Sequence, residues 1–184
     1  MAYFDLEICG LKRNLPLIQV GRNTKIASFS ILGDVELVDA VADEMALTIK
    51  QLDLRFDYIV GPEVKAVPLI HGVAKRLGYK RFIICRKSIK PYMVSPIKVS
   101  PLSHFPKHAK PLVINGEDAQ LLKDKKVLIV DDVISSGVTM RMMKYLIEKL
   151  GAKVVGIMVA IKQGEQYDNF DNLYYLKELP IFTN

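Results

Sequence analysis

Residues 127–139, Val-Leu-Ile-Val-Asp-Asp-Val-Ile-Ser-Ser-Gly-Val-Thr, decide both the fold and the chemistry that we predict for this chain. Four successive apolar residues are typical of a strand that is buried on both faces of a parallel sheet. They lead directly into two carboxylates, Asp131 and Asp132, and a short serine-rich turn then opens a helix. This order places charged side chains at the carboxyl end of a strand, where parallel sheets bind their ligands.

The turn after this strand has the composition of a phosphate-binding loop. The first N–H groups of a helix have no carbonyl partner and point outward, and the helix N-terminus carries partial positive charge. Glycine lets the backbone close around a ligand. The predicted cradle for one phosphate consists of Ser135, Ser136, Gly137, Val138 and Thr139. Because the adjacent carboxylates suit sugar hydroxyls or hydrated magnesium, the segment predicts a site for ribose 5-phosphate.

Strands alternate with helices around this segment. Apolar residues spaced by three and four predict a helix over 34–52 that is capped by Asp34. The other predicted elements are strands over 58–60, 82–85, 112–114, 126–130, 154–161 and 173–176, helices over 64–77 and 137–150, and a short helical stretch before 125. This alternation predicts an α/β fold, with a mainly parallel twisted sheet flanked by helices.

Length and composition exclude several classes of protein. A chain of 184 residues, half of them hydrophobic, fits one folded domain. No apolar run approaches the roughly 20 residues that a membrane helix needs, and the acidic start does not resemble a signal peptide. Two cysteines cannot build a disulfide framework or a four-thiolate metal site. We therefore expect a cytoplasmic protein with no membrane partner.

The positive net charge of +6 comes from one part of the chain. Residues 64–116 hold eleven Lys and Arg and no Asp or Glu, whereas the rest of the chain holds fifteen basic and twenty acidic residues. Four prolines between 86 and 110 disfavour helices and central strands there. We expect a long functional loop in this segment, part of it an edge hairpin. The charge favours an anionic partner, either a polyphosphate substrate or nucleic acid.

The string 127–139 resembles the fingerprint of the type I phosphoribosyltransferases, which has four apolar residues, two acids, two variable residues and a Thr/Ser-rich glycine turn. The resemblance covers nearly the whole chain and is strongest to the adenine and xanthine (purine) enzymes. Residues 61–66, Gly-Pro-Glu-Val-Lys-Ala, stand where the family has its pyrophosphate-binding loop, with lysine for arginine and alanine for glycine. Residues 86–90, Arg-Lys-Ser-Ile-Lys, resemble the basic entry to the family's flexible catalytic loop.

The resemblance implies a domain organisation and a reaction. One domain would cover 1–184, with a small hood from about 1–33 and 162–184 and a flexible loop over about 86–110. The reaction would transfer ribose 5-phosphate from phosphoribosyl pyrophosphate (PRPP), with bound Mg²⁺, to a free purine base, and would release pyrophosphate. The resemblance also implies a homodimer and a role in purine salvage.

The same resemblance implies roles for individual residues. The cradle would hold the 5-phosphate, and Asp131 and Asp132 would hold the ribose hydroxyls and, through substrate and water, the Mg²⁺. The residues implied to contact pyrophosphate are Glu63, Val64, Lys65 and Ala66. The residues implied to stabilise the departing pyrophosphate, which act with the two aspartates as the catalytic set, are Arg86, Lys87 and Lys90. No general base stands out in the sequence.

The base and the rival functions stay open at this stage. Phe29 is a candidate for stacking on a base, and Lys162 is a candidate for meeting a 6-oxo group. Adenine is favoured and xanthine or another 6-oxopurine follows, although residues 132–137 also resemble orotate enzymes. The alternatives are a PRPP-sensing regulator and a non-catalytic nucleotide-binding protein of the same fold. Nucleic acid is not the expected partner, because such regulators carry an added DNA-binding module.

Overall fold

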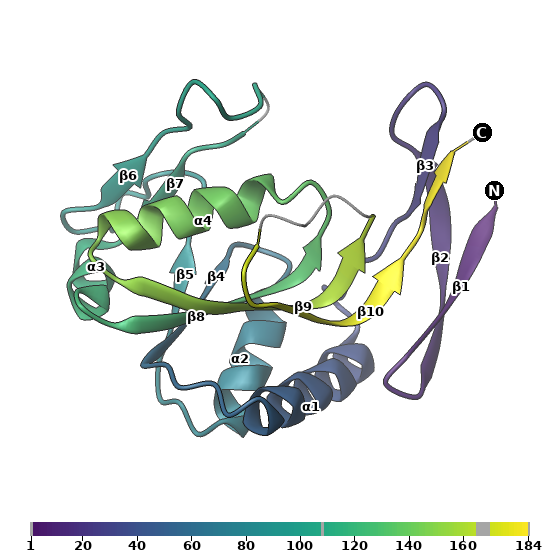
Figure 1. The fold of residues 1–184 in the computed structure, drawn as a ribbon, viewed down its shortest axis with the longest axis horizontal. Helices are drawn as coiled ribbons and strands as arrows, with labels where there is room; N and C mark the ends of the chain where they lie inside the picture. The colour runs from purple at the N-terminus through teal and green to yellow at the C-terminus, as the bar shows by residue number, and fades with distance from the viewer. Residues whose placement is uncertain (1, 108, 165–169, 184) are drawn as a thin grey trace.

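The computed structural model describes residues 2–107, 109–164 and 170–183 (Figure 1). Its centre is a sheet of five strands, all parallel, in the order β10-β9-β8-β4-β5. The strands are β4 (Tyr58–Pro62), β5 (Phe82–Cys85), β8 (Lys126–Ile134), β9 (Lys153–Gln163) and β10 (Leu173–Leu179). The predicted α/β fold with a parallel sheet is therefore confirmed.

Helices cover both faces of this sheet (Figure 1). The helices are α1 (Val35–Gln51) and α2 (Val67–Arg76) on one face, and α3 (Gly116–Leu122) and α4 (Val138–Lys149) on the other. Successive residues of a strand point to opposite faces. Leu128 and Val130 of β8 accordingly pack with α1 and α2, whereas Val127 and Ile129 pack with α3 and α4. The apolar run of the fingerprint thus supplies both halves of the core.

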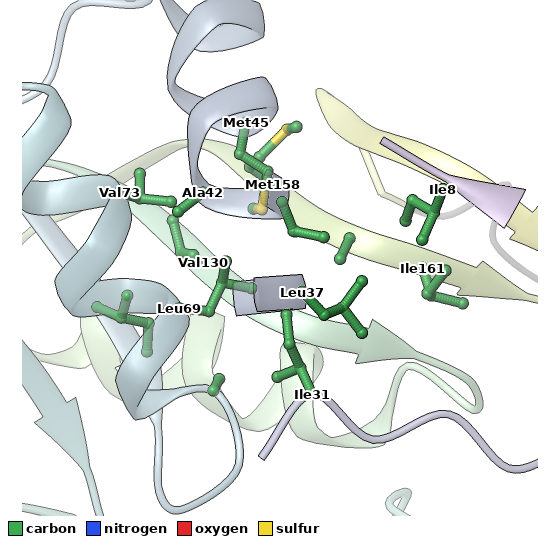
Figure 2. Close-up of a cluster of buried hydrophobic side chains, with 14 of the residues drawn as sticks. Ile8, Ile31, Leu37, Ala42, Met45, Leu69, Val73, Val130, Met158 and Ile161 are labelled. Atoms are coloured by element: carbon green, nitrogen blue, oxygen red, sulfur yellow. The ribbon is translucent and has the colours of Figure 1, made fainter. Parts of the chain in front are cut away.

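A second sheet joins the two ends of the chain. Its four antiparallel strands are β1 (Tyr3–Ile8), β2 (Leu11–Gln19), β3 (Thr24–Ala27) and β11 (Ile181–Thr183), in that order. We call it the hood sheet. It lies beside the ends of β9 and β10 (Figure 1), and its Ile8 belongs to the same buried cluster as Ile161 of β9 (Figure 2).

The C-terminal share of the hood sheet is smaller than the expected span of 162–184. Residues 173–179 pair in parallel with β9 in the central sheet, so that among the described residues of this span only β11 enters the hood sheet. Residues 165–169 and 184 lie outside the described part of the chain.

Among the described residues, backbone pairing and side-chain hydrogen bonds attach the proline-rich segment 86–110 to the body of the protein. The backbone of Arg86 exchanges two hydrogen bonds of 2.7 Å with Val113. Val94 donates to the Asn115 side chain at 2.9 Å. Strand β6 (Ile97–Val99) pairs with β7 (Leu112–Ile114), which confirms the expected edge hairpin. Residue 108 of the expected flexible loop lies outside the described residues.

Several predicted elements have different bounds in the structure, and two of these differences lie at the predicted site. Helix α2 starts at Val67 instead of at residue 64, because residues 63–66 form a loop and Pro68 fits the first turn of a helix. Strand β8 extends four residues beyond the predicted end and includes both aspartates. Among the described residues, no helix combines the length and the apolar character that crossing a membrane requires.

Candidate functional site

A cavity of about 400 Å³ opens at the carboxyl ends of β4 and β8. The chain continues from β4 to β5 in one direction along the sheet and from β8 to β9 in the other, so the cavity lies where the strand order reverses. Open parallel sheets bind ligands at such points. The lining residues are Pro62, Glu63, Val64, Lys65, Ala66, Lys87, Asp131, Asp132, Val133 and Thr139.

Asp131 and Asp132 line this cavity from the carboxyl-terminal part of β8. They are only 6% and 7% exposed, and the N–H of Asp132 donates to Oδ1 of Asp131 at 2.8 Å. Burial and the neighbouring Asp132 carboxylate raise the pKa of Asp131 well above its usual range, whereas the charge of Lys87 acts in the opposite sense. Two carboxylates in contact repel each other, and a hydroxyl donor or a cation relieves that repulsion. The pair is therefore suited to a sugar diol.

The predicted phosphate cradle lies in the turn between β8 and α4 and in the first residues of α4. Residues 135–137 bend between β8 and α4, and Gly137 caps the helix in the left-handed conformation with φ of 68°. The first hydrogen bond within the helix runs from the N–H of Arg141 to the carbonyl of Gly137. The preceding N–H groups have no partner within the helix, and its first turn holds no acidic residue. Ser135, Ser136 and Thr139 are exposed beside these donors.

The loop 63–66 forms the opposite wall of the cavity. A cis peptide bond joins Glu63 to Val64. Val64 and Lys65 are exposed, whereas Ala66 is 1% exposed and packs in the core at the start of α2. Lys65 is therefore the side chain of this loop that is free to present a positive charge to a ligand.

Lys87 lines the same cavity from the segment that follows β5, and Arg86 precedes it in the chain. In the parallel pairing of β4 and β5, Pro62 lies opposite Cys85. The residues that follow the two strands therefore lie side by side at the carboxyl edge of the sheet. Glu63 accepts a hydrogen bond of 2.9 Å from the N–H of Lys87 and a second of 3.3 Å from Arg86. The positive charges predicted to face pyrophosphate therefore lie beside the predicted pyrophosphate loop.

The predicted site residues that do not line the cavity are Arg86, Lys90, Phe29, Lys162 and residues 135–138. Arg86 and residues 135–138 adjoin lining residues in the chain, whereas Lys90, Phe29 and Lys162 have other contacts. Lys90 bonds within its own turn, to Met93. Phe29 is 7% exposed and packs in the main core. Lys162 lies 3.4 Å from Glu178 and over the ring of Tyr175. Their roles toward a base or pyrophosphate stay predictions.

Sequence reasoning missed two residues beside the cradle. The ring of Phe170 lies so close to Gly137 that a Cβ added to the glycine would be 2.9 Å from it. Arg141 donates to the carbonyl of Ser136 at 3.1 Å. A cation in the first turn of a helix is unfavourable unless an anion is near. The position of Arg141 near the start of the predicted helix could therefore have been recognised in the sequence as a sign of an anion site. Phe170 lies in the acidic, Asn-rich end of the chain, and nothing in the sequence there indicated a contact with the cradle.

The residues of the cavity fit a magnesium ion that is held mainly by its substrate. Asp131 and Asp132 supply the oxygen ligands that Mg²⁺ prefers. In the described part of the chain, no three His, Cys, Asp or Glu side chains lie close enough to hold a metal by themselves. A protein site with so few ligands leaves most coordination positions to substrate oxygens and water, as magnesium sites for phosphate substrates do.

The fold and the cavity together define an α/β protein with two buried carboxylates and two lysines in a cavity at the carboxyl edge of its parallel sheet. Residues 30–181 match the phosphoribosyl transferase domain, and the chain belongs to this family.

Curated relatives with different base specificities resemble the chain to similar degrees. It is 34% identical to the orotate phosphoribosyltransferase of Podospora anserina, a match that covers 71% of this chain and 53% of that protein. It is 28% identical to the hypoxanthine/guanine phosphoribosyltransferase of Methanohalophilus mahii, covering 72% of this chain and 64% of the relative. It is 32% identical to the adenine phosphoribosyltransferase of Symbiobacterium thermophilum, a match that covers 72% of this chain and 74% of that protein. The chain thus spans about half to two thirds of the length of the first two.

Solved structures agree with the fold. The adenine phosphoribosyltransferase of Thermoanaerobacter pseudethanolicus matches with a TM-score of 0.66 at 22% identity, over 79% of this chain and 82% of that one. The adenine phosphoribosyltransferase of Trypanosoma brucei, solved with AMP, pyrophosphate and ribose-5-phosphate, matches with a TM-score of 0.61 at 22% identity, over 78% and 64%.

Proposed function

We propose that the chain is a phosphoribosyltransferase that transfers ribose 5-phosphate from PRPP to a free purine base and releases pyrophosphate. One observation carries the proposal. A single cavity brings together a helix N-terminus, two buried carboxylates and a basic wall, from the ends of three neighbouring strands. These are the binding elements for a 5-phosphate, a ribose diol and a pyrophosphate, in the order in which PRPP carries them.

Each part of the cavity takes one part of PRPP in this proposal. The 5-phosphate accepts hydrogen bonds from the N–H groups at the start of α4 and from the hydroxyls of Ser135, Ser136 and Thr139. The ribose hydroxyls donate to Asp131 and Asp132. The pyrophosphate lies against the backbone of residues 63–66 and the side chain of Lys65, with Lys87 on its far side.

Catalysis then consists mainly of positioning and charge stabilisation. Loss of pyrophosphate from C1 leaves positive charge on the sugar and adds negative charge to the leaving group. In this proposal Lys65, Lys87 and the neighbouring Arg86 supply positive charge to the leaving group, and the Asp131–Asp132 pair supplies negative charge to the sugar. Bound Mg²⁺ neutralises further pyrophosphate charge. The nucleophile is a nitrogen of the base.

Adenine is the base that we favour, followed by the 6-oxopurines. The support is the likeness of the fold to adenine enzymes and the similar identity to an adenine and to a hypoxanthine/guanine relative. Because one relative is an orotate phosphoribosyltransferase, orotate is also tested as a substrate. The hood sheet, beside the carboxyl ends of β9 and β10, is the expected cover for the base.

A base-panel assay tests the proposal. The protein, Mg²⁺ and PRPP are incubated with adenine, hypoxanthine, guanine, xanthine or orotate, and pyrophosphate release is followed. We expect turnover with one purine at a rate well above the others. Absence of turnover with every base would contradict the enzymatic proposal. PRPP binding without turnover would instead support the PRPP-sensing alternative, and a salt-dependent gel shift with nucleic acid would strengthen that alternative. Light scattering tests the proposed homodimer.

A further inference from the structure

Glu63 lines the anion cavity although its side chain is negatively charged. The side chain is 14% exposed, so the surrounding solvent screens it only in part. Two like charges 4 Å apart repel each other by about 4 kcal/mol at an effective dielectric constant near 20. A carboxylate in this position therefore opposes a bound pyrophosphate unless its charge is compensated by a neighbour.

That compensation comes from the two basic residues after β5. Oε1 of Glu63 accepts from the backbone N–H of Lys87 at 2.9 Å, and Oε2 accepts from Nη1 of Arg86 at 3.3 Å. The backbone N–H of Glu63 also donates to the carbonyl of Cys85 at 2.9 Å. Three hydrogen bonds thus join the loop after β4 to the last residue of β5 and to the loop after β5, and two of them use the Glu63 carboxylate.

The rest of Arg86 has little freedom. Its backbone exchanges two hydrogen bonds with Val113, and its guanidinium lies 5.7 Å from the centre of the Tyr92 ring. A guanidinium has five N–H donors, so the contact with Glu63 at Nη1 leaves other donors for a second anion. Arg86 does not line the cavity itself, but it contacts Glu63, which does, so these donors are held next to the loop proposed to bind pyrophosphate.

We propose that Glu63 is a positioning residue, which uses its carboxylate to set the Arg86 guanidinium and the Lys87 backbone for the leaving pyrophosphate. The proposal rests on the proposed function, and in it the side chain of Glu63 does not contact pyrophosphate. Its charge favours catalysis through the two basic residues that it holds.

Two other roles for Glu63 predict different outcomes. If the carboxylate only repelled pyrophosphate, its removal would tighten pyrophosphate binding. If it only stabilised the fold, its removal would lower the melting temperature and leave kcat and KM of the folded enzyme unchanged. As a positioning residue, it affects kcat more than KM, because a small displacement of groups that act in the transition state costs up to about 100-fold in rate.

The test compares Glu63→Gln and Glu63→Ala with the wild type. Glutamine keeps an acceptor for the Lys87 N–H and loses the charge that attracts Arg86, whereas alanine loses both. The matched control is Asp118→Asn, which removes the charge of another carboxylate from a pair with an arginine: Arg81 lies 2.7 Å from Asp118, and neither residue lines the cavity. Binding of inorganic pyrophosphate with Mg²⁺ is measured by calorimetry, and kcat and KM are measured with the base that the panel selects.

We expect pyrophosphate affinity and kcat to fall in the order wild type, Gln, Ala, with at least a tenfold loss for Ala and a smaller change in KM. Asp118→Asn should match the wild type. Equal or tighter pyrophosphate binding in both Glu63 variants, or an unchanged kcat, would overturn this inference alone. A wild-type protein that binds neither pyrophosphate nor PRPP would overturn the proposed function together with it.

Discussion

The guanidinium of Arg141 donates a hydrogen bond of 3.1 Å to the backbone carbonyl of Ser136, in the turn that precedes its own helix. In a trans peptide, the carbonyl of one residue and the N–H of the next point in opposite directions. A fixed Ser136 carbonyl therefore fixes the direction of the Gly137 N–H. The arginine also brings positive charge to the N-terminus of α4, whose own first turn holds no acidic residue.

Arg141→Met should weaken the binding of ribose 5-phosphate by about tenfold, because one hydrogen bond of this kind contributes about 1 to 1.5 kcal/mol. Calorimetric titration with ribose 5-phosphate measures the change. The control is Lys144→Met, one turn further along α4, where the lysine pairs only with Glu148 among the contacts described. Equal affinity in Arg141→Met and wild type would show that the arginine does not order the cradle.

Gly137→Ala should damage the cradle in two ways. The left-handed conformation costs a residue with a side chain about 1–3 kcal/mol, and the new Cβ would lie 2.9 Å from the Phe170 ring. We expect a lower melting temperature and at least tenfold weaker PRPP binding. The double variant Gly137→Ala/Phe170→Leu removes the close contact and keeps the backbone cost. Recovery of part of the affinity in that variant is expected, and a fully functional single variant would contradict the geometry.

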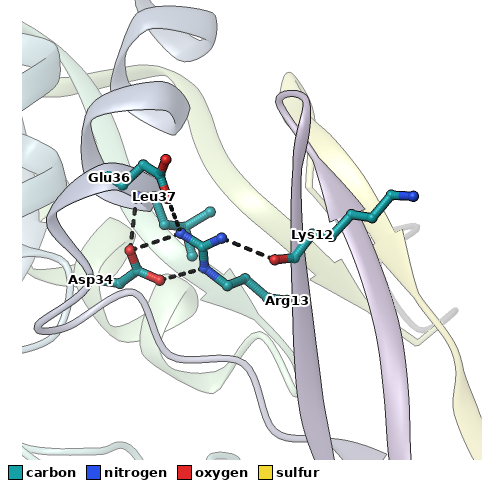
Figure 3. A network of polar contacts seen from close by, with 5 residues as sticks. All are labelled: Lys12, Arg13, Asp34, Glu36 and Leu37. Carbon is teal, nitrogen blue, oxygen red and sulfur yellow. Dashed lines mark hydrogen bonds and ion pairs between the residues drawn. The ribbon is translucent and has the colours of Figure 1, made fainter.

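Asp34 should make the stability of the fold depend on acid pH. It caps α1 by accepting from the Leu37 N–H at 3.0 Å, and it pairs with Arg13 of the hood sheet (Figure 3). The hydrogen bonds from Arg13 lower the pKa of Asp34. A carboxyl whose pKa is lowered by folding stabilises the native state above its unfolded pKa of about 4, and this contribution is lost as the pH falls.

Asp34→Ala should therefore destabilise the protein by about 1–2 kcal/mol at pH 7. Asp34→Asn keeps the cap and should cost less. Urea unfolding at pH 7 and at pH 3 checks both variants, and the difference from the wild type should shrink at pH 3. A difference that stays constant between the two pH values would show that the charge of Asp34 contributes nothing.

The two cysteines should differ in reactivity. Burial raises the pKa of Cys85 to about 12, and its side chain is 1% exposed. Burial and the charge of Glu44 also raise the pKa of Cys9, which is only partly buried. Since the thiolate is the reactive form, iodoacetamide at pH 8 should label Cys9 slowly and Cys85 only when the protein unfolds. Mass spectrometry of the labelled peptides measures this, and early labelling of Cys85 would show that β5 opens readily.

The parts of the fold that were predictable are those determined by local sequence. Continuous apolar runs predicted β5 at its observed bounds and the buried part of β8, and the helical spacing predicted α1 together with its Asp34 cap. Most of the residues that line the cavity were also predictable, because the residues that follow neighbouring parallel strands meet at one edge of the sheet.

The hood sheet was not predictable as strands, because its determinants are not local. The β1–β2 turn uses Cys9 and Gly10, both with positive φ, and a cysteine does not carry the usual Asn-Gly signature of such a turn. Its partner strand β11 lies at the opposite end of the chain. The contacts of Glu63 with Arg86 and Lys87 are likewise 23 and 24 residues apart in sequence, and only the register of β4 and β5 brings them together.

Titration of the wild type and of the double variant Asp131→Asn/Asp132→Asn with PRPP and Mg²⁺, followed by calorimetry, tests the central claim most directly. The carboxylates accept charge-assisted hydrogen bonds from the ribose in our account, each worth about 1.5–3 kcal/mol. We predict one PRPP site per chain in the wild type and at least 100-fold weaker binding in the variant, with the fold retained in circular dichroism. Unchanged affinity in a folded variant, or no binding to the wild type, would contradict the account.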